Sequence, residues 1–263
     1  MLRGGTMPTA GDIYYFASKQ GAATKPAVVL IHGAGGDHLH WPHNIRRLGE
    51  YRVFAPDLPG HGKSRGIGAQ SIREYAKTIM DWLMEIGIHR AVFVGHSMGG
   101  AISQTLALEY SEHVLGIVLV STGAQLAVNT NLLEKLSVPA TLPKALELVV
   151  KWSFSKEVDK KIIQRVKKKM LETRPTVIYG DFLACNEFDL IERVKDIAVP
   201  TCVIYGTEDK MTPSPLSEYL DMQIPNSSLT SISGAGHMVM LERSEEVAKA
   251  IRIFLDGVIT PVP

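Results

Sequence analysis

Short apolar runs rich in Val and Ile alternate with longer segments of helical spacing along much of this chain. Apolar runs of about 4–8 residues are typical of strands buried on both faces of a parallel sheet. We predict strands at residues 26–32, 52–55, 91–95, 115–121, 202–205 and 228–232. The helices expected with them cover residues 71–86, 100–110, 215–222 and 244–255. This alternation predicts an α/β fold with a doubly wound, mostly parallel sheet.

The alternation stops between residues 125 and 196, where further helical segments follow one another without a β-like run. These segments cover residues 132–136, 142–152, 156–171 and 176–188. We therefore expect an α/β core formed by residues 1–124 and 197–263, with residues 125–196 inserted into it as a helical cap. The alternative is that these helices merely cover the sheet.

The composition disfavours several classes of protein. The chain has 263 residues, 45% of them hydrophobic, a formal net charge of +1 and two cysteines. It is long enough to bury a large core, it lacks the basic excess typical of nucleic-acid binding, and its cysteines favour a reducing compartment. The first eight residues contain no signal-peptide core, and the apolar runs are too short to span a membrane. We expect a soluble, cytoplasmic protein that binds neither nucleic acid nor membrane; its oligomeric state stays open.

The pentapeptide Gly95-His96-Ser97-Met98-Gly99 lies between a predicted strand and a predicted helix. G-x-S-x-G in this setting is typical of a nucleophile elbow, a sharp turn that projects the serine hydroxyl at the carboxyl edge of the sheet. Small residues must flank the serine to avoid clashes in this turn. Ser97 is therefore the candidate nucleophile, and the alternative is a glycine-rich turn with a capping serine.

A serine hydroxyl needs a general base to become a nucleophile, and the base needs an acid to orient it. His237 is the best candidate for the base because it follows a loop of small residues beyond the last predicted strand. Asp209 lies in a turn directly after the preceding strand and is the candidate acid, with Glu208 as the alternative.

A glycine-rich loop, residues 33–36, leaves an early predicted strand. A serine hydrolase must stabilise its tetrahedral oxyanion with backbone N–H groups. We predict that the N–H groups of Ala34 in this loop and of Met98 after the nucleophile are these donors. A dinucleotide-binding fingerprint fails here because its last glycine position is His38, and a phosphate loop fails further on because its first glycine position is Asp57.

Several histidines and an aspartate crowd the same loop: His32, Asp37, His38, His40 and His43. Imidazoles at close spacing suggest a metal site, but no helical H-x-x-x-H pattern is present and serine chemistry gives a metal no role. We expect no metal and no cofactor. His38, His40 and Trp41 are candidates for the lining of the substrate entrance.

The sequence resembles the α/β-hydrolase fold serine hydrolases, in particular the small, capped carboxylesterase and lactonase-like branch. The matching landmarks are His32-Gly33, residues 57–64, residues 95–100, residues 206–209 with Pro213, and residues 234–237. They run in the family's order through nearly all of the chain outside the expected cap. The order Ser97, Asp209, His237 is also that of the family's triad. The resemblance implies that haloalkane dehalogenases and most epoxide hydrolases would carry an acidic residue where Ser97 stands, which argues against both activities.

We expect a serine hydrolase that cleaves small-molecule carboxylic esters of short to medium acyl chain through an acyl-enzyme. A dedicated metabolic hydrolase of a lactone or of a carbon–carbon bond, and an acyltransferase, stay open as alternatives. A non-catalytic ligand receptor that kept the fold is the least favoured reading.

Overall fold

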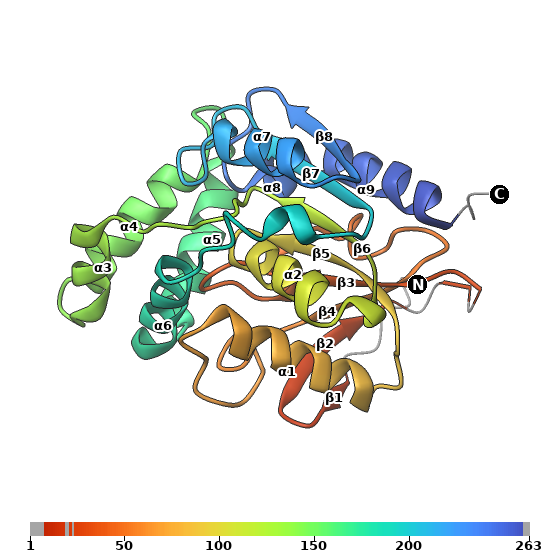
Figure 1. Cartoon of the computed structure of the whole chain (residues 1–263). Helices are drawn as coiled ribbons and strands as arrows, with labels where there is room; N and C mark the ends of the chain where they lie inside the picture. Colours follow the sequence, from red (N-terminus) through yellow and green to blue (C-terminus); the bar gives the residue numbers. More distant parts are fainter. Residues whose placement is uncertain (1–7, 19–20, 23, 260–263) are drawn as a thin grey trace.

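The computed structural model describes residues 8–18, 21–22 and 24–259. Residues 1–7 lie outside the described residues, and with them most of the segment for which the sequence predicts no signal peptide. The described chain forms an eight-stranded sheet in the order β1-β2-β4-β3-β5-β6-β7-β8 (Figure 1). The strands are β1 (Thr9–Ala10), β2 (Ile13–Ala17), β3 (Ala27–Ile31), β4 (Arg52–Pro56), β5 (Ala91–His96), β6 (Val114–Val120), β7 (Thr201–Gly206) and β8 (Ser227–Ile232).

The strands β3 to β8 pair in parallel, whereas β2 pairs antiparallel with β4 and β1 pairs antiparallel with β2. The α/β prediction and all the strands expected from the sequence are confirmed, each within one residue or so at either end. The two strands that were not predicted, β1 and β2, lie at the edge of the sheet.

Helices cover both faces of the sheet, because alternate residues of a strand point to opposite sides. On one face, Val29 and Ile31 of β3 share a core with α1 (Ile72–Glu85), α2 (Met98–Glu109) and α7 (Ser214–Gln223). On the other face, Val28 and Leu30 share a core with α8 (Val239–Glu242) and α9 (Ser244–Ile259). Within the described residues, no helix is both long enough and apolar enough to cross a membrane.

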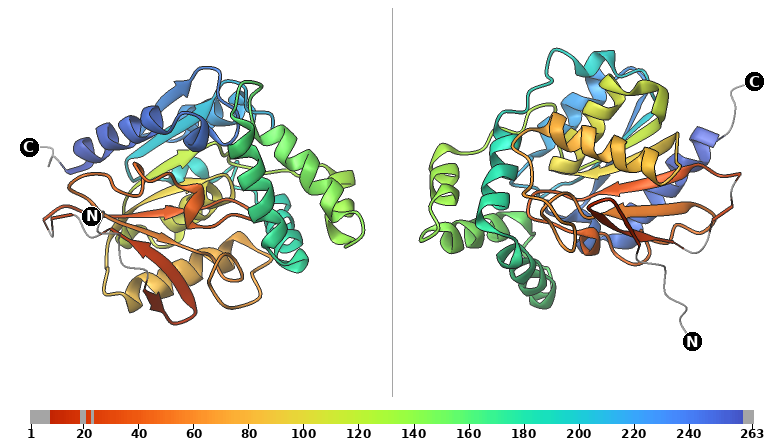
Figure 2. Two further views of the ribbon diagram at one scale, coloured as in Figure 1. Left: turned by 180° about the vertical axis from the view of Figure 1, so that it is seen from behind. Right: turned by 90° about the horizontal axis from the view of Figure 1, so that it is seen from below.

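Four helices between β6 and β7 lie together at one side of the sheet in every view of Figures 1 and 2. They are α3 (Thr130–Ser137), α4 (Leu142–Ser153), α5 (Lys160–Glu172) and α6 (Pro175–Asn186). A bridge between Gln125 and Asp189 joins the two ends of this segment, and the side-chain amide of Gln125 donates to the Asp189 carboxylate over 2.8 Å. The division of the chain into a core and a cap at residues 125–196 stays a prediction.

Candidate active site

Ser97 connects β5 to α2 with a backbone φ of 52° and ψ of −116°. This conformation is strained for a residue with a side chain, by about 1–3 kcal/mol, and strain of this kind clusters at functional sites. The neighbouring glycines are required, because a Cβ on Gly95 would collide with the carbonyl group of Gly99, and one on Gly99 with the carbonyl oxygen of Ile31. The Ser97 N–H donates to the Val120 carbonyl over 2.9 Å, which fixes the turn against β6.

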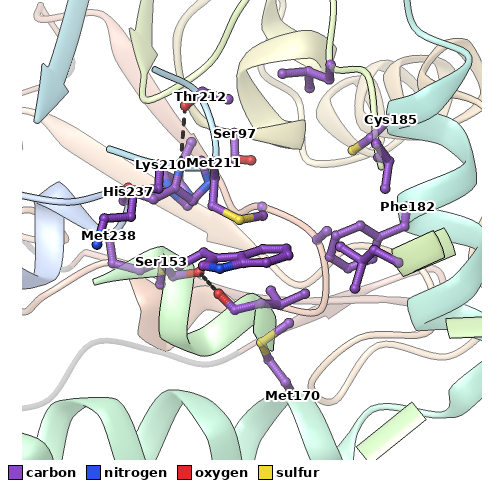
Figure 3. A pocket seen from close by; sticks show the side chains of 18 of the residues that line it. Ser97, Ser153, Met170, Phe182, Cys185, Lys210, Met211, Thr212, His237 and Met238 are labelled. Atoms are coloured by element: carbon purple, nitrogen blue, oxygen red, sulfur yellow. Dashed lines mark hydrogen bonds between the residues drawn. The ribbon is translucent and has the colours of Figure 1, made fainter. Parts of the chain in front are cut away.

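His237 and Asp209 meet from two neighbouring loops at the carboxyl ends of β7 and β8. The Nδ1 atom of His237 lies 2.9 Å from Oδ2 of Asp209, and the two residues are only 4% and 6% exposed. Ser97 and His237 line the same cavity (Figure 3). Glu208, the alternative acid, is exposed, so the structure favours Asp209 as the partner of the imidazole.

Four hydrogen bonds hold the Asp209 carboxylate. Oδ1 accepts from the N–H groups of Met211 and Thr212, at 2.8 and 2.9 Å, and Oδ2 accepts from the Thr212 hydroxyl at 2.8 Å and from His237. Burial alone would raise the pKa of Asp209, but the nearby His237 and these donors outweigh it and lower the pKa. The carboxylate therefore stays charged and oriented toward the imidazole.

Sequence reasoning missed Thr212, whose Oγ1 also lies 3.2 Å from Nδ1 of His237 (Figure 3). A signal for it was present, because an aspartate readily accepts the backbone N–H groups two and three residues later, which brings a residue at that distance onto its carboxylate. A second contact is made by His96, whose ring lies 4.8 Å from that of His237, centroid to centroid. Nε2 of His96 lies 3.0 Å from the His237 carbonyl oxygen, and burial lowers the pKa of His96 well below its usual value.

The predicted oxyanion donors are Ala34, which lines the same cavity as Ser97, and Met98, which follows Ser97 in the chain. Met98 is buried as the first residue of α2. Neither backbone N–H donates to an acceptor among the described residues, so both are available to a ligand. Gly33 allows the loop of residues 33–36 to approach the turn at Ser97 closely, because a Cβ on Gly33 would lie 2.9 Å from His96 Nδ1 and 3.2 Å from the Ser97 Cβ.

His32 orients the loop that carries Ala34. Its Nε2 accepts the Leu58 N–H over 3.0 Å, so its proton is on Nδ1, which donates to the Gly33 carbonyl over 2.8 Å. Burial lowers the pKa of His32 to about 4, which keeps the ring neutral and this hydrogen-bond pattern intact near neutral pH.

The cavity has a volume of about 250 Å³ and lies between the carboxyl end of the sheet and the helices α3 to α6 (Figure 3). Among the described residues that line it, Lys210 is the one Lys, Arg, Asp or Glu. The lining is mainly apolar and includes Leu126, Val128, Leu132, Val149, Trp152, Val166, Met170, Phe182, Met211, Leu216 and Met238.

Of the three residues predicted at the substrate entrance, His40 lines this cavity and the other two do not. The N–H and Nδ1 of His38 both lie 2.7 Å from Oδ1 of Asp57, so its ring belongs to a structural contact. Trp41 is fully buried in the core. The predictions for His38 and Trp41 are therefore corrected: the His38 ring contacts Asp57, the Trp41 side chain packs in the core, and neither lines the cavity.

Among the described residues, no group of three or more His, Cys, Asp or Glu side chains is arranged to hold a metal ion. Cys185 and Cys202 are separate, buried free thiols, and Cys185 lies on the cavity wall.

Comparison with known proteins agrees with this geometry. Residues 28–250 match the family model described as the alpha/beta hydrolase family. The pimeloyl-[acyl-carrier protein] methyl ester esterase of Pectobacterium carotovorum is 27% identical over 241 residues, which cover 86% of this chain and 93% of that protein.

Solved structures are also similar. One described as a thermophilic esterase is 35% identical, with a TM-score of 0.82 and 94% of each chain covered. The enol-lactonase of Burkholderia xenovorans LB400 shares the fold, with a TM-score of 0.86 at 21% identity over 95% of this chain and 100% of that one. Since the family model spans most of its length, the chain belongs to the alpha/beta hydrolase family of hydrolases.

Proposed function

We propose that this protein is a serine carboxylesterase that cleaves esters of short to medium acyl chain through an acyl-enzyme. The observation that carries the proposal is that Ser97, in a strained turn, and His237 both line one mainly apolar cavity, with Asp209 hydrogen-bonded to the imidazole behind it. Two similar proteins are esterases, one of them a methyl ester esterase, which supports the same reaction class.

In the first half of the reaction, the Ser97 hydroxyl attacks the acyl carbon while Nε2 of His237 takes its proton. The imidazolium is stabilised by Asp209, which holds Nδ1–H. The N–H groups of Ala34 and Met98 bind the oxyanion of the tetrahedral intermediate. The intermediate then collapses, the bond to the alkoxide breaks, and His237 returns the proton to the leaving alcohol.

In the second half, a water molecule attacks the acyl-enzyme and gives its proton to His237. The same oxyanion donors stabilise the second intermediate, and the carboxylic acid leaves as Ser97 recovers its proton. The mainly apolar lining suits an acyl chain, and the limited volume of about 250 Å³ favours chains of short to medium length.

The experiment is a panel of p-nitrophenyl esters from acetate to palmitate, run beside a panel of lactones, with the wild type and Ser97→Ala. We expect the variant to lose turnover by on the order of a millionfold with an unchanged circular dichroism spectrum. Wild-type Ser97 should also be labelled by a fluorophosphonate, whereas the variant should not.

Each part of the proposal can fail separately. Substantial esterase activity in folded Ser97→Ala contradicts the nucleophile, and a rate maximum at palmitate contradicts the chain length. Strong turnover of one lactone with weak turnover of every ester would replace the carboxylesterase by a lactonase. A wild type that neither reacts with the probe nor hydrolyses any substrate would favour a ligand receptor.

A further inference from the structure

Asp181 is a fully buried acidic residue on α6 that has no part in the proposed reaction. Its Oδ2 accepts the N–H of Gly35 over 2.8 Å and lies 2.7 Å from Nε2 of His61, and its Oδ1 accepts the Tyr75 hydroxyl over 2.6 Å. One carboxylate from α6 thus contacts the loop after β3, the loop after β4, and helix α1.

The contact with Gly35 is next to the predicted oxyanion donor, Ala34. Gly35 N–H belongs to the peptide unit that follows Ala34, and Asp181 fixes the direction of that unit. The preceding unit is fixed through the Gly33 carbonyl, which accepts from Nδ1 of His32 and from the N–H of Gly36 over 3.1 Å. Because a trans peptide is planar, holding the Gly33 carbonyl also sets the direction of the Ala34 N–H on its opposite side. Two successive peptide planes around the donor are therefore held by buried side chains.

Helix α6 also presses directly on this loop. Gly35 has a φ of +62°, which favours glycine, and a Cβ on it would lie 2.6 Å from Cδ1 of Ile178. Ile178 and Asp181 are three residues apart, so they lie on the same face of the helix. The apolar contact sets the distance of α6 from the loop, and the carboxylate sets the orientation of the peptide.

A buried charged group makes this contact between α6 and the loop at a high desolvation cost. Burying a carboxylate costs several kcal/mol unless it is paired, and apolar side chains often pack a helix onto a core at lower cost. Here His61 is the paired group: burial alone would lower the pKa of His61, but Asp181 outweighs burial and raises it. The ring of His61 lies 4.9 Å from that of His32, centroid to centroid. His61 therefore contacts both side chains that hold the loop, Asp181 and His32.

We propose that Asp181 is a positioning residue that holds the oxyanion loop in its donor geometry and couples it to the placement of α6. The inference rests on the proposed serine hydrolase function. Through Asp181, the helix that helps to enclose the cavity also sets the rate of the chemical step.

The test compares Asp181→Ala, Asp181→Asn and Tyr75→Phe with the wild type on a soluble p-nitrophenyl ester. Asp181→Ala removes the acceptor of Gly35 N–H, and we expect kcat to fall roughly tenfold to a hundredfold, less than the loss of a whole donor, with KM changed less than about threefold. Asp181→Asn keeps one acceptor oxygen of nearly the same shape and should lose less. Tyr75→Phe is the matched control, because it removes a donor from the same carboxylate but leaves the Gly35 contact, and kcat should stay within about threefold.

A second readout separates the oxyanion loop from general damage. A trifluoromethyl ketone forms a hemiketal with Ser97, and the oxyanion of this hemiketal accepts from the Ala34 and Met98 N–H groups. Its inhibition constant should therefore rise across the variants in proportion to the fall in kcat/KM. A folded Asp181→Ala that keeps kcat, or inhibitor affinity that does not follow kcat/KM, would overturn the inference. Equal losses in Tyr75→Phe and Asp181→Ala would overturn it as well.

Failure of the proposed function would look different. In that case the wild type itself would be inert toward esters and fluorophosphonate. If Asp181→Ala does not fold, Asp181→Asn decides: an intermediate loss of kcat and of inhibitor affinity supports positioning, and a wild-type value of both contradicts it.

Discussion

The Asp209 carboxylate accepts four hydrogen bonds, and only one of them comes from the imidazole that it orients. Two of the others are backbone N–H groups of its own turn, which holds the carboxylate in place whether or not substrate is bound. The Thr212 hydroxyl is the remaining donor, and it is the one that a side-chain substitution can remove.

We predict that Thr212→Val lowers kcat/KM roughly tenfold, because a hydrogen bond to a charged group contributes about 1.5–3 kcal/mol and part of it is recovered by the remaining donors. Steady-state kinetics on a p-nitrophenyl ester measure the loss, which should lie mainly in kcat. Thr105→Val is the matched control: Thr105 is also buried, but its hydroxyl donates to the Ala101 carbonyl within α2. Unchanged kcat/KM in Thr212→Val would mean that the backbone donors alone hold Asp209.

At the residue scale, the sequence predicts candidate groups from the order in which they follow the strands, and their catalytic roles stay a prediction. Ser97, His237 and Asp209 each follow a strand, and parallel strands bring their carboxyl ends to one edge. Asp181 was out of reach, because its partner Gly35 lies 146 residues away and no local pattern links them. His38 and Trp41 were misplaced because a loop sequence does not reveal which of its side chains turn inward.

Close approach between elements leaves its mark on glycines inside helices. A Cβ on Gly180 of α6 would lie 2.8 Å from the Ala69 carbonyl oxygen, so this glycine lets α6 approach the loop before α1. Gly257 of α9 has open space around its Cβ position. The two glycines differ in their surroundings while sharing a helical backbone.

We expect opposite effects on stability from the same substitution at these positions. Gly257→Ala should raise the free energy of unfolding by about 0.5–1 kcal/mol, because alanine restricts the unfolded chain and favours the helix. Gly180→Ala should lower it by about 1–3 kcal/mol, because overpacking outweighs the helical gain. Urea unfolding of both variants checks the pair, and stabilisation by Gly180→Ala would show that α6 can move without cost.

Long elements were predicted better than short ones. The strands buried on both faces leave continuous apolar runs and the helices leave a helical spacing of apolar residues, and the positions predicted from both are confirmed. The strand β2 has the sequence Ile-Tyr-Tyr-Phe-Ala and pairs at the edge, and β1 has two residues, so neither shows the Val and Ile run of a central strand. The short helix α8 spans four residues, too few for a helical period.

Across the whole molecule, buried histidines link folding to pH. Burial lowers the pKa of His32 to about 4 and also lowers the pKa values of His40 and His96, whereas Asp181 outweighs burial and raises the pKa of His61. A lowered histidine pKa means that the unfolded chain binds protons near pH 6.5 and the folded chain only at lower pH. Stability from these groups is therefore lost as pH falls, while His61 contributes in the opposite sense.

We predict that the free energy of unfolding decreases between pH 6.5 and 4, with roughly 3 kcal/mol of the loss from His32 alone. Urea unfolding at several pH values between 7 and 4 measures the slope. His96→Gln should reduce the slope, and the exposed His43 provides the control, His43→Gln, which should leave it unchanged. A stability that rises as pH falls through this range would contradict the prediction.

The expectation of a cytoplasmic protein stays a prediction, and so does the choice among ester, lactone and acyl-transfer chemistry. Amino-acid composition relates to compartment and substrate only as a statistical tendency, because both depend on molecules outside the chain. The fold, by contrast, follows from patterns repeated along the whole sequence.

The bridge between Gln125 and Asp189 brings the two ends of the helical segment together, so that the chain leaves the core and returns to it at one place. A segment with adjacent ends can be lengthened, shortened or exchanged in evolution without changing the order of the strands, so substrate preference can change while the chemistry is inherited. Asp181 limits this freedom. Any helix that replaces α6 has to supply an acceptor for the Gly35 N–H, or the new protein will bind its substrate and turn it over slowly.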